Sequence, residues 1–220
     1  MTEYIIVRAK RRSVQIKIDH DGKVIVRAPF WVSLRQIDQF VHQNEAWIAK
    51  RLDVHQQQPH RQSHHFNDGD MFWYLGKEYP LKISGEISGK VRFENALIIP
   101  NTKPELARTM ILKWYKNEAD MFLRQRLDQF ATLMDIKYHA VKITSATSRW
   151  GSCNHLNSIS LNWKLIQVPK DVIDYVVVHE LAHILQHNHS KLFWAEVEKV
   201  LPDYKIRRKW LKDHGFLLQF

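Results

Sequence analysis

Residues Val176 to Trp194 read VVVHELAHILQHNHSKLFW and contain the motif His179-Glu180-Leu181-Ala182-His183. The residues around this motif are mostly apolar, which predicts a helix that is largely buried. Histidines four residues apart on a helix share one face, so both imidazoles can reach a single Zn²⁺, with Glu180 near the open side of the ion. Burying two histidines and a glutamate requires partners, and a metal ion is the simplest one.

The chemistry of zinc explains why these residue types are needed together. Neutral imidazole binds zinc at about 2.0–2.1 Å, and a catalytic site combines three protein ligands with a water whose pKa falls to about 7. Glu180 would take the proton from that water and later deliver it to a leaving group. This pattern favours a hydrolase with one zinc ion per chain.

A third ligand must follow the first two histidines. His189 fits because Ser190, directly after it, is a typical N-cap for a helix over residues 191–199, which would hold the histidine in a turn between two rigid elements. The alternatives are His187, Glu196 and Glu198.

The spacing of the third histidine resembles the metzincin pattern, with one difference. Five residues separate His183 from His189, but Gln186 stands where that pattern has glycine. Asn188 is the residue expected to take a left-handed conformation if the chain reverses here, because asparagine tolerates it better than most residues.

Length and composition indicate a folded protein of one large domain or two small ones. The chain has 220 residues, of which 45% are hydrophobic. The single cysteine, Cys153, excludes an internal disulfide and a multi-cysteine zinc site and fits a reducing compartment. There is no apolar run near eighteen residues and no signal-like N-terminus, so we expect a cytoplasmic protein without a membrane partner.

The net charge of +10 and the pI near 9.7 favour anionic partners such as nucleotides, nucleic acid or acidic peptides. The basic residues form separate clusters at residues 8–12, 137–142 and 205–212, so the sequence leaves open whether they converge in space.

The first half of the chain has the pattern of strands with one helix. Alternating residues on both sides of Asp21-Gly22 predict a hairpin within residues 3–28. Ser33 and Gln36 form a capping box for a helix to about Leu52, which should cover the hairpin. Residues 55–68 are rich in His and Gln and indicate a surface loop, and short strands at 71–75, 79–83, 91–93 and 96–99 are expected to extend the same β layer.

The second half has the pattern of helices around a small sheet. Thr102 is the expected N-cap of a long helix from Pro104 to about residue 134, and strands are expected at 141–146 and 159–165. Pro169 and Pro202 precede the last helices. The composition break near residue 101 suggests an N-terminal β-rich domain, 1–100, with one helix, and a metal-binding domain, 101–220, in an α+β fold.

Several motifs in order resemble the YgjP-like family of metal-dependent hydrolases, formerly a domain of unknown function and related to SprT-like and other zincin proteins. They are Arg149-Trp150-Gly151-Ser152-Cys153, Leu161-Asn162-Trp163, the segment from Asp174 to His183, and His189-Ser190 before Phe193-Trp194. The resemblance implies a zincin-like metallopeptidase fold preceded by a β-rich half. It also implies zinc on His179, His183 and His189, with Glu180 as the general base.

Helix or strand periodicity does not explain the loop from Arg149 to Cys153. Arg149 can bind a carboxylate or phosphate oxygen, and Ser152 can donate a hydrogen bond to a developing oxyanion. The alternative is a packed turn, with Cys153 as a small buried apolar residue.

Three functions remain open. The first is a zinc-dependent hydrolase of the metallopeptidase type. The second, which the resemblance adds, is a metal-dependent pyrophosphatase acting on uridine triphosphate (UTP), although no glycine-rich phosphate loop is present. The third is a nucleic-acid-binding module with structural zinc, which we do not favour because structural zinc sites are mostly cysteine-rich.

Overall fold

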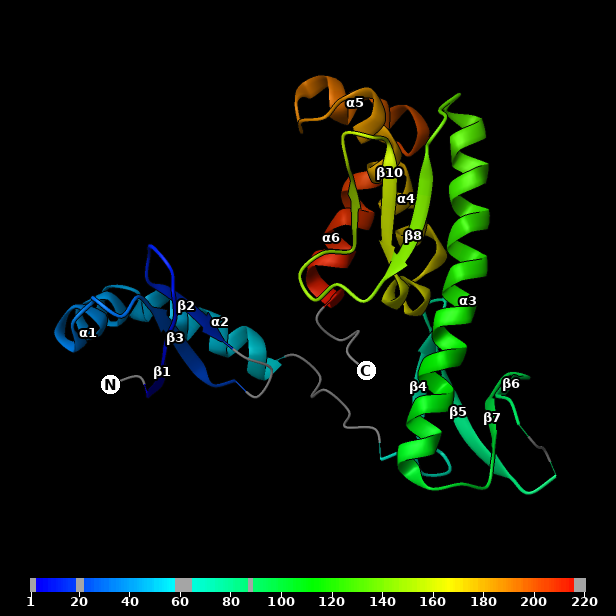
Figure 1. Ribbon diagram of the computed structural model, residues 1–220, viewed down its shortest axis with the longest axis horizontal. Helices are drawn as coiled ribbons and strands as arrows, with labels where there is room; N and C mark the ends of the chain where they lie inside the picture. Colours follow the sequence, from blue (N-terminus) through cyan, green and yellow to red (C-terminus); the bar gives the residue numbers. More distant parts are fainter. Residues whose placement is uncertain (1–2, 19–21, 58–64, 87–88, 216–220) are drawn as a thin grey trace. The chain divides into compact units, whose positions relative to one another are not determined.

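The computed structural model describes residues 3–18, 22–57, 65–86 and 89–215 (Figure 1). The chain divides into two compact units, Met1–Gln62 and Ser63–Phe220. The boundary expected near residue 100 lies inside the second unit, because Phe72, Leu81 and Leu97 share one hydrophobic core with the long helix.

The first unit contains a three-stranded sheet. Strands β2 (Gln15–Ile18) and β3 (Val24–Ala28) are antiparallel, as the hairpin prediction requires, and Gly22 takes a φ of 78°. Asp21 lies outside the described residues. Strand β1 (Tyr4–Arg8) pairs with β3 in parallel on its other side, giving the order β1-β3-β2.

Two helices, not the expected one, follow this sheet. Helix α1 (Leu34–Gln43) begins with the predicted capping box, in which Gln36 N–H donates to Ser33 Oγ and the Gln36 side chain interacts with Ser33 N–H. At Asn44, whose side chain donates to Phe40 O at 2.7 Å, the chain leaves α1 and α2 (Glu45–Gln57) begins. The helices cover the sheet, because Val26, Ile37 and Ile48 belong to one buried cluster.

The second unit has its own four-stranded sheet, which does not extend the first. Its strands are β4 (Met71–Tyr74), β5 (Lys77–Ser84), β6 (Arg92–Phe93) and β7 (Leu97–Pro100), in the order β4-β5-β7-β6. The β4–β5 turn uses Leu75 at φ 48° and Gly76 at φ 82°. Leu75 N–H donates to Ile166 O at 2.8 Å, so the turn contacts the segment that leads into the metal-site helix.

Helix α3 (Pro104–Leu133) spans the second unit (Figure 1). Lys103, not Thr102, is its N-cap and makes no side-chain capping bond, while Pro104 supplies the pre-set φ of a first helical residue. Its buried face includes Ile111, Tyr115 and Leu123, and the Tyr115 hydroxyl donates to Trp73 O at 2.6 Å. One helix thereby ties the four-stranded sheet to the rest of the unit.

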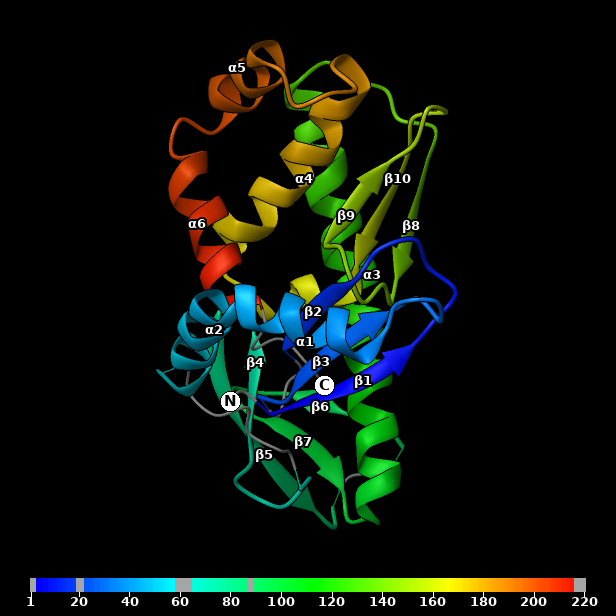
Figure 2. The ribbon, with the colours of Figure 1, turned by 90° about the vertical axis from the view of Figure 1, so that its left-hand side faces the viewer.

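The remaining chain builds the part that carries the predicted site. Strands β8 (Ala140–Thr144), β9 (Gly151–Cys153) and β10 (Ser158–Asn162) form a sheet of order β8-β10-β9, in which β9 is an antiparallel edge. A 3₁₀ turn, η1 (Trp163–Gln167), leads to α4 (Lys170–Leu185), α5 (Lys191–Val200) and α6 (Tyr204–His214). In Figure 2, α4 lies between this sheet and α6.

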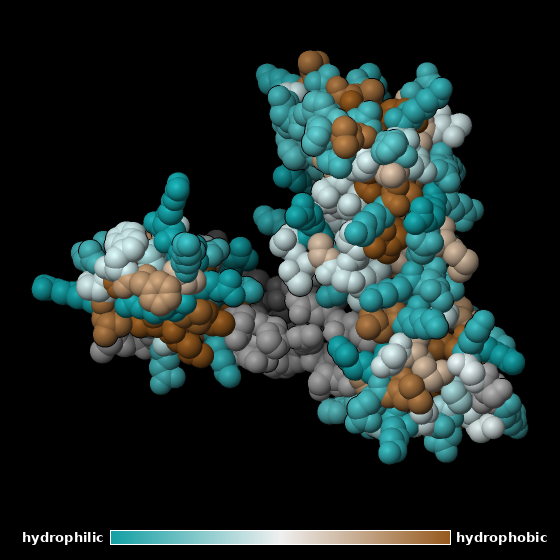
Figure 3. All heavy atoms as spheres, viewed as in Figure 1, coloured by the Kyte–Doolittle hydropathy of each residue, from teal (hydrophilic) through white to brown (hydrophobic). Residues whose placement is uncertain are grey.

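This arrangement confirms the predicted α+β class, with a long helix, a small sheet and the buried helix α4. Hydrophilic residues cover most of the face shown in Figure 3, with small apolar patches between them. None of the described helices is long and apolar enough to cross a membrane.

Candidate metal centre

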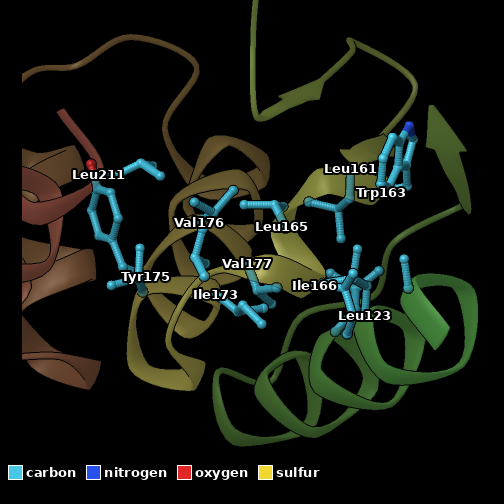
Figure 4. Packing of buried hydrophobic residues seen from close by; sticks show 14 of the residues in the cluster. Leu123, Leu161, Trp163, Leu165, Ile166, Ile173, Tyr175, Val176, Val177 and Leu211 are labelled. Carbon is cyan, nitrogen blue, oxygen red and sulfur yellow. The ribbon is translucent and has the colours of Figure 1, made fainter. Parts of the chain in front are cut away.

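Helix α4 is buried on nearly all sides, as its apolar sequence predicted. In Figure 4, Ile173, Val176 and Val177 face residues of η1 and α3, while Tyr175 points toward Leu211 of α6. Asp171 lies in the first turn, where its negative charge interacts favourably with the helix dipole. Packing on several sides fixes the rotation of α4 and therefore the direction in which its histidines point.

The structure brings His179, His183 and His189 together. Their nearest ring nitrogens all lie within 4.8 Å of one another, and the Nε2 atoms of His179 and His189 are 3.1 Å apart. Three ligands at about 2.0–2.1 Å from a tetrahedral zinc would be about 3.4 Å apart. Three histidine nitrogens grouped in this way are a donor set that fits one zinc ion.

The segment between α4 and α5 delivers His189 without a left-handed residue. Gln186 takes an extended conformation, with φ −140° and ψ 104°, and Asn188 is absent from the positive-φ residues of the described chain, so that expectation is wrong. Ser190 caps α5 as predicted, accepting from Phe193 N–H at 3.4 Å.

The other candidates for third ligand lie outside the histidine cluster. His187 is exposed and is not part of it. Glu196 forms an ion pair with Lys199 at 2.7 Å, and Glu198 lies 3.9 Å from Lys205.

Aromatic side chains of α5 and α6 support the three histidines. The fully buried Phe193 ring lies 4.7–4.9 Å from all three imidazole rings. Trp194 is stacked between His189, at 5.7 Å, and Tyr204, at 5.2 Å, and the Arg208 guanidinium lies 4.8 Å from the Trp194 ring. The sequence pattern assigned no role to the side chains of Trp194, Tyr204 or Arg208, whose contacts beside the histidines depend on the packing of α5 against α6.

The two histidines of α4, His179 and His183, are held in the neutral form that binds metal. Burial lowers the pKa of His179 to about 3, helped by the neighbouring histidines and Arg208. Burial and His189 also lower the pKa of His183, whose hydrogen bonds to the backbone at Gln186 and His187 act in the opposite direction. Hydrogen bonds between an imidazole and the backbone orient histidines that bind a metal. Nδ1 of His179 is buried and has no hydrogen-bond partner among the described residues.

The Glu180 side chain extends from α4 toward strand β9, and only 5% of the residue's surface is exposed. Burial raises its pKa to about 8, and the charge of Arg149 opposes this shift. A Cβ at Gly151 would lie 2.5 Å from Oε1 of Glu180, so the glycine is what allows β9 to pass this close.

Asn162 holds the loop that precedes β9. Its buried Nδ2 donates to Ala146 O at 2.7 Å and to Arg149 O at 3.1 Å, and its own N–H donates to Trp150 O at 2.8 Å. Its Oδ1 also accepts from Lys164 N–H at 3.1 Å. The sequence pattern indicated no structural role for this asparagine, which is one of the few buried polar residues in the described chain.

The loop itself combines exposed and packed positions. Arg149 is exposed, and Ser152 is half-buried in β9, opposite Ser160 of β10. Trp150 packs against Gly215, where an added Cβ would lie 2.9 Å from its ring. Cys153 is half-buried and burial raises the pKa of its thiol, which fits a packing role.

A buried helix with two histidines and a glutamate, completed by a third histidine, defines a metal-dependent hydrolase. Sequence comparison then identifies the family within this class. The chain belongs to the YgjP-like family, described as a metallopeptidase domain, whose sequence model matches residues 12–214.

Two solved structures are similar to part of the chain. Both are metallopeptidase zymogens, abylysin of Pyrococcus abyssi and jannalysin of Methanocaldococcus jannaschii, with identities of 24% and 18%. Each covers 41% of this chain at a TM-score of 0.37, and 93% and 91% of their own lengths are matched. A search of curated proteins gives no match.

Proposed function

We propose that the protein is a zinc-dependent peptidase in which Glu180 acts as the general base. The observation that carries this proposal is the convergence of three histidines at the end of α4, with a buried glutamate between the first two. Membership in a metallopeptidase family supports peptide as the substrate class.

His179, His183 and His189 would hold the ion. Zinc in such a site supplies a Lewis acid that polarises a carbonyl and activates water at neutral pH. The protein contributes the fixed ligand directions, because Phe193 packs against all three rings and α4 cannot rotate in its core.

Glu180 would accept a proton from the attacking water and deliver it to the leaving amine. A base with a pKa near the operating pH can do both, and burial moves this carboxyl toward that range. Because Glu180 is packed against the backbone of Gly151, its carboxyl has little freedom to leave this position.

Strand β9 would align the substrate. It is the edge of its sheet and contacts α4, so an extended peptide can pair with its outer side while passing the histidines. Ser152 on this strand would donate to the oxyanion, and Arg149 just before it would bind a carboxylate of the substrate.

UTP pyrophosphatase activity is the alternative, and structural zinc in a nucleic-acid-binding module is the second alternative. Three imidazoles suit zinc better than magnesium, the usual partner of phosphates, which argues against the first. A buried glutamate beside the histidines has no evident task in the second.

The test is hydrolysis by the zinc-loaded protein of a panel of unstructured peptides and a panel of nucleoside triphosphates. Peptide cleavage should be lost in Glu180→Gln, which removes the base, while metal analysis still finds one zinc per chain. Glu198→Gln is the control, because that side chain is 55% exposed and lies outside the histidine cluster. Cleavage of triphosphates alone, or full activity of Glu180→Gln, would refute the proposal.

A further inference from the structure

A polar cleft of about 350 Å³ opens between the loop 146–150 and the end of α6. Three cationic side chains line it, Arg149 from the loop, Lys164 from η1 and Lys212 from α6. None of its described lining residues is Asp or Glu. We call it the basic cleft, and it joins one of the basic clusters of the sequence to cations from two distant segments.

The basic cleft lies beside the reacting groups. Trp150 lines it, and the next residue, Gly151, is in contact with Glu180. Arg149, which also lines the cleft, lies two residues before Gly151 in the same segment. On α6, Lys212 follows Arg208 by one helical turn, and the Arg208 guanidinium lies 4.8 Å from the ring of Trp194, which stacks on His189. A substrate whose scissile bond lies at the histidines would therefore have neighbouring groups within reach of these cations.

The walls of the cleft are fixed before any ligand binds. Asn162, only 3% exposed, holds the carbonyls of Ala146 and Arg149. Across the cleft, the Trp150 ring packs closely against Gly215 at the end of α6. A preformed site with several cations loses little entropy on binding an anion and gains charge-assisted hydrogen bonds.

We propose that the basic cleft is a subsite for a carboxylate of the substrate, so that the enzyme selects acidic peptides. This inference rests on the proposed peptidase function. The carboxylate has two sources, an Asp or Glu side chain near the scissile bond or the free C-terminus of the peptide. Arg149 offers paired N–H donors that match a carboxylate, and the two lysines add positive charge.

Binding can be measured without cleavage in the zinc-loaded Glu180→Gln protein, using fluorescent peptides and anisotropy. One pair of peptides differs by Glu or Gln near the centre, and a second pair by a free or amidated C-terminus. We expect the charged member of one pair to bind about tenfold more tightly than the neutral member, and that pair identifies the source of the carboxylate. The ratio of the two affinities should be smaller at high salt. Equal affinities within both pairs would overturn the proposal.

Variants on one helix separate the cleft from the general positive charge of the protein. Lys212→Gln should reduce the preference several-fold and leave binding of the neutral peptide unchanged. Lys209→Gln removes the same charge from α6, but Lys209 is paired with Asp213 at 2.6 Å and does not line the cleft, so the preference should persist. An equal loss of the charge preference in both variants would contradict a specific subsite. So would weaker binding of the neutral peptide by Lys212→Gln.

Failure of the subsite and failure of the peptidase function are distinguishable. The wild-type protein is assayed in parallel on the neutral peptides. Cleavage of these without any charge preference would remove the subsite alone, whereas absence of peptide cleavage together with absence of peptide binding would remove both.

Discussion

Replacing Gly151 by Ala should disable the base while leaving the fold intact. The added Cβ would lie 2.5 Å from Oε1 and 2.6–2.7 Å from Cδ and Cγ of Glu180, where ordinary contact begins near 3.4 Å. The carboxyl must therefore retreat by about 0.9 Å. A displacement of about 1 Å can cost about 100-fold in rate, or about 2.7 kcal/mol of transition-state stabilisation. We expect kcat/KM for peptide cleavage to fall by about this factor.

The matched control is Gly85→Ala, where an added Cβ meets nothing within 4 Å. Peptide cleavage is measured for both variants and the wild type, with thermal unfolding and zinc content beside each. Because the atoms in the way belong to one side chain and not to the backbone, Gly151→Ala should still fold, at a cost of about 1–3 kcal/mol in stability. Normal activity of a folded, zinc-loaded Gly151→Ala protein would show that the position of Glu180 does not govern catalysis.

Four further outcomes are expected. Removing zinc with a chelator should lower the free energy of unfolding by about 4 kcal/mol, relative to protein in a zinc concentration about a thousandfold above Kd. The change is measured as a lower unfolding temperature, and an unchanged temperature would speak against a bound ion. In the metal-free protein, burial raises the pKa of Glu180 from 4.5 to about 8. The free energy of unfolding, relative to that of Glu180→Gln, should therefore fall as the pH rises across that window, by up to about 1.4 kcal/mol per pH unit. Denaturant titrations of both proteins at pH 5 and 8 measure this, and a difference in stability that is the same at both pH values would count against the shift. Gly76→Ala, which combines a φ of 82° with a Cβ 2.7 Å from the Pro169 backbone, should cost about 3 kcal/mol in urea unfolding, more than Gly69→Ala, which has a similar φ but open space. Asn162→Ala should cost about 2–3 kcal/mol and weaken peptide binding by releasing the loop at Arg149, whereas an unchanged urea midpoint would show that its hydrogen bonds contribute little.

Local chemistry explains what the sequence predicted well. The apolar residues around His179 required a buried helix, and Ser33 and Ser190 cap their helices through bonds to nearby backbone N–H groups. These features depend on residues within a few positions of one another, so the pattern alone contains them.

Features that depend on distant partners could not be derived in the same way. The parallel pairing of β1 with β3 and the separation of the two sheets follow from packing between segments, not from alternation. Asn44 ends a helix whose apolar stripe continues beyond it, because its side chain bonds to Phe40 O. Within the site, the role of Asn162 and the convergence of Arg149 with Lys212 exist only once the loop and α6 have come together.

The two hydrophobic cores described above have no residue in common, and the smaller one contains seven buried side chains among the residues that the structure describes. Cooperativity in unfolding comes from shared contacts, so heating should produce two heat-absorption peaks in a calorimeter, with the smaller unit melting first. Substitutions such as Val26→Ala or Ile37→Ala would shift only the first peak. All three histidines of the metal centre lie in the second unit, so these two substitutions should leave the zinc content unchanged.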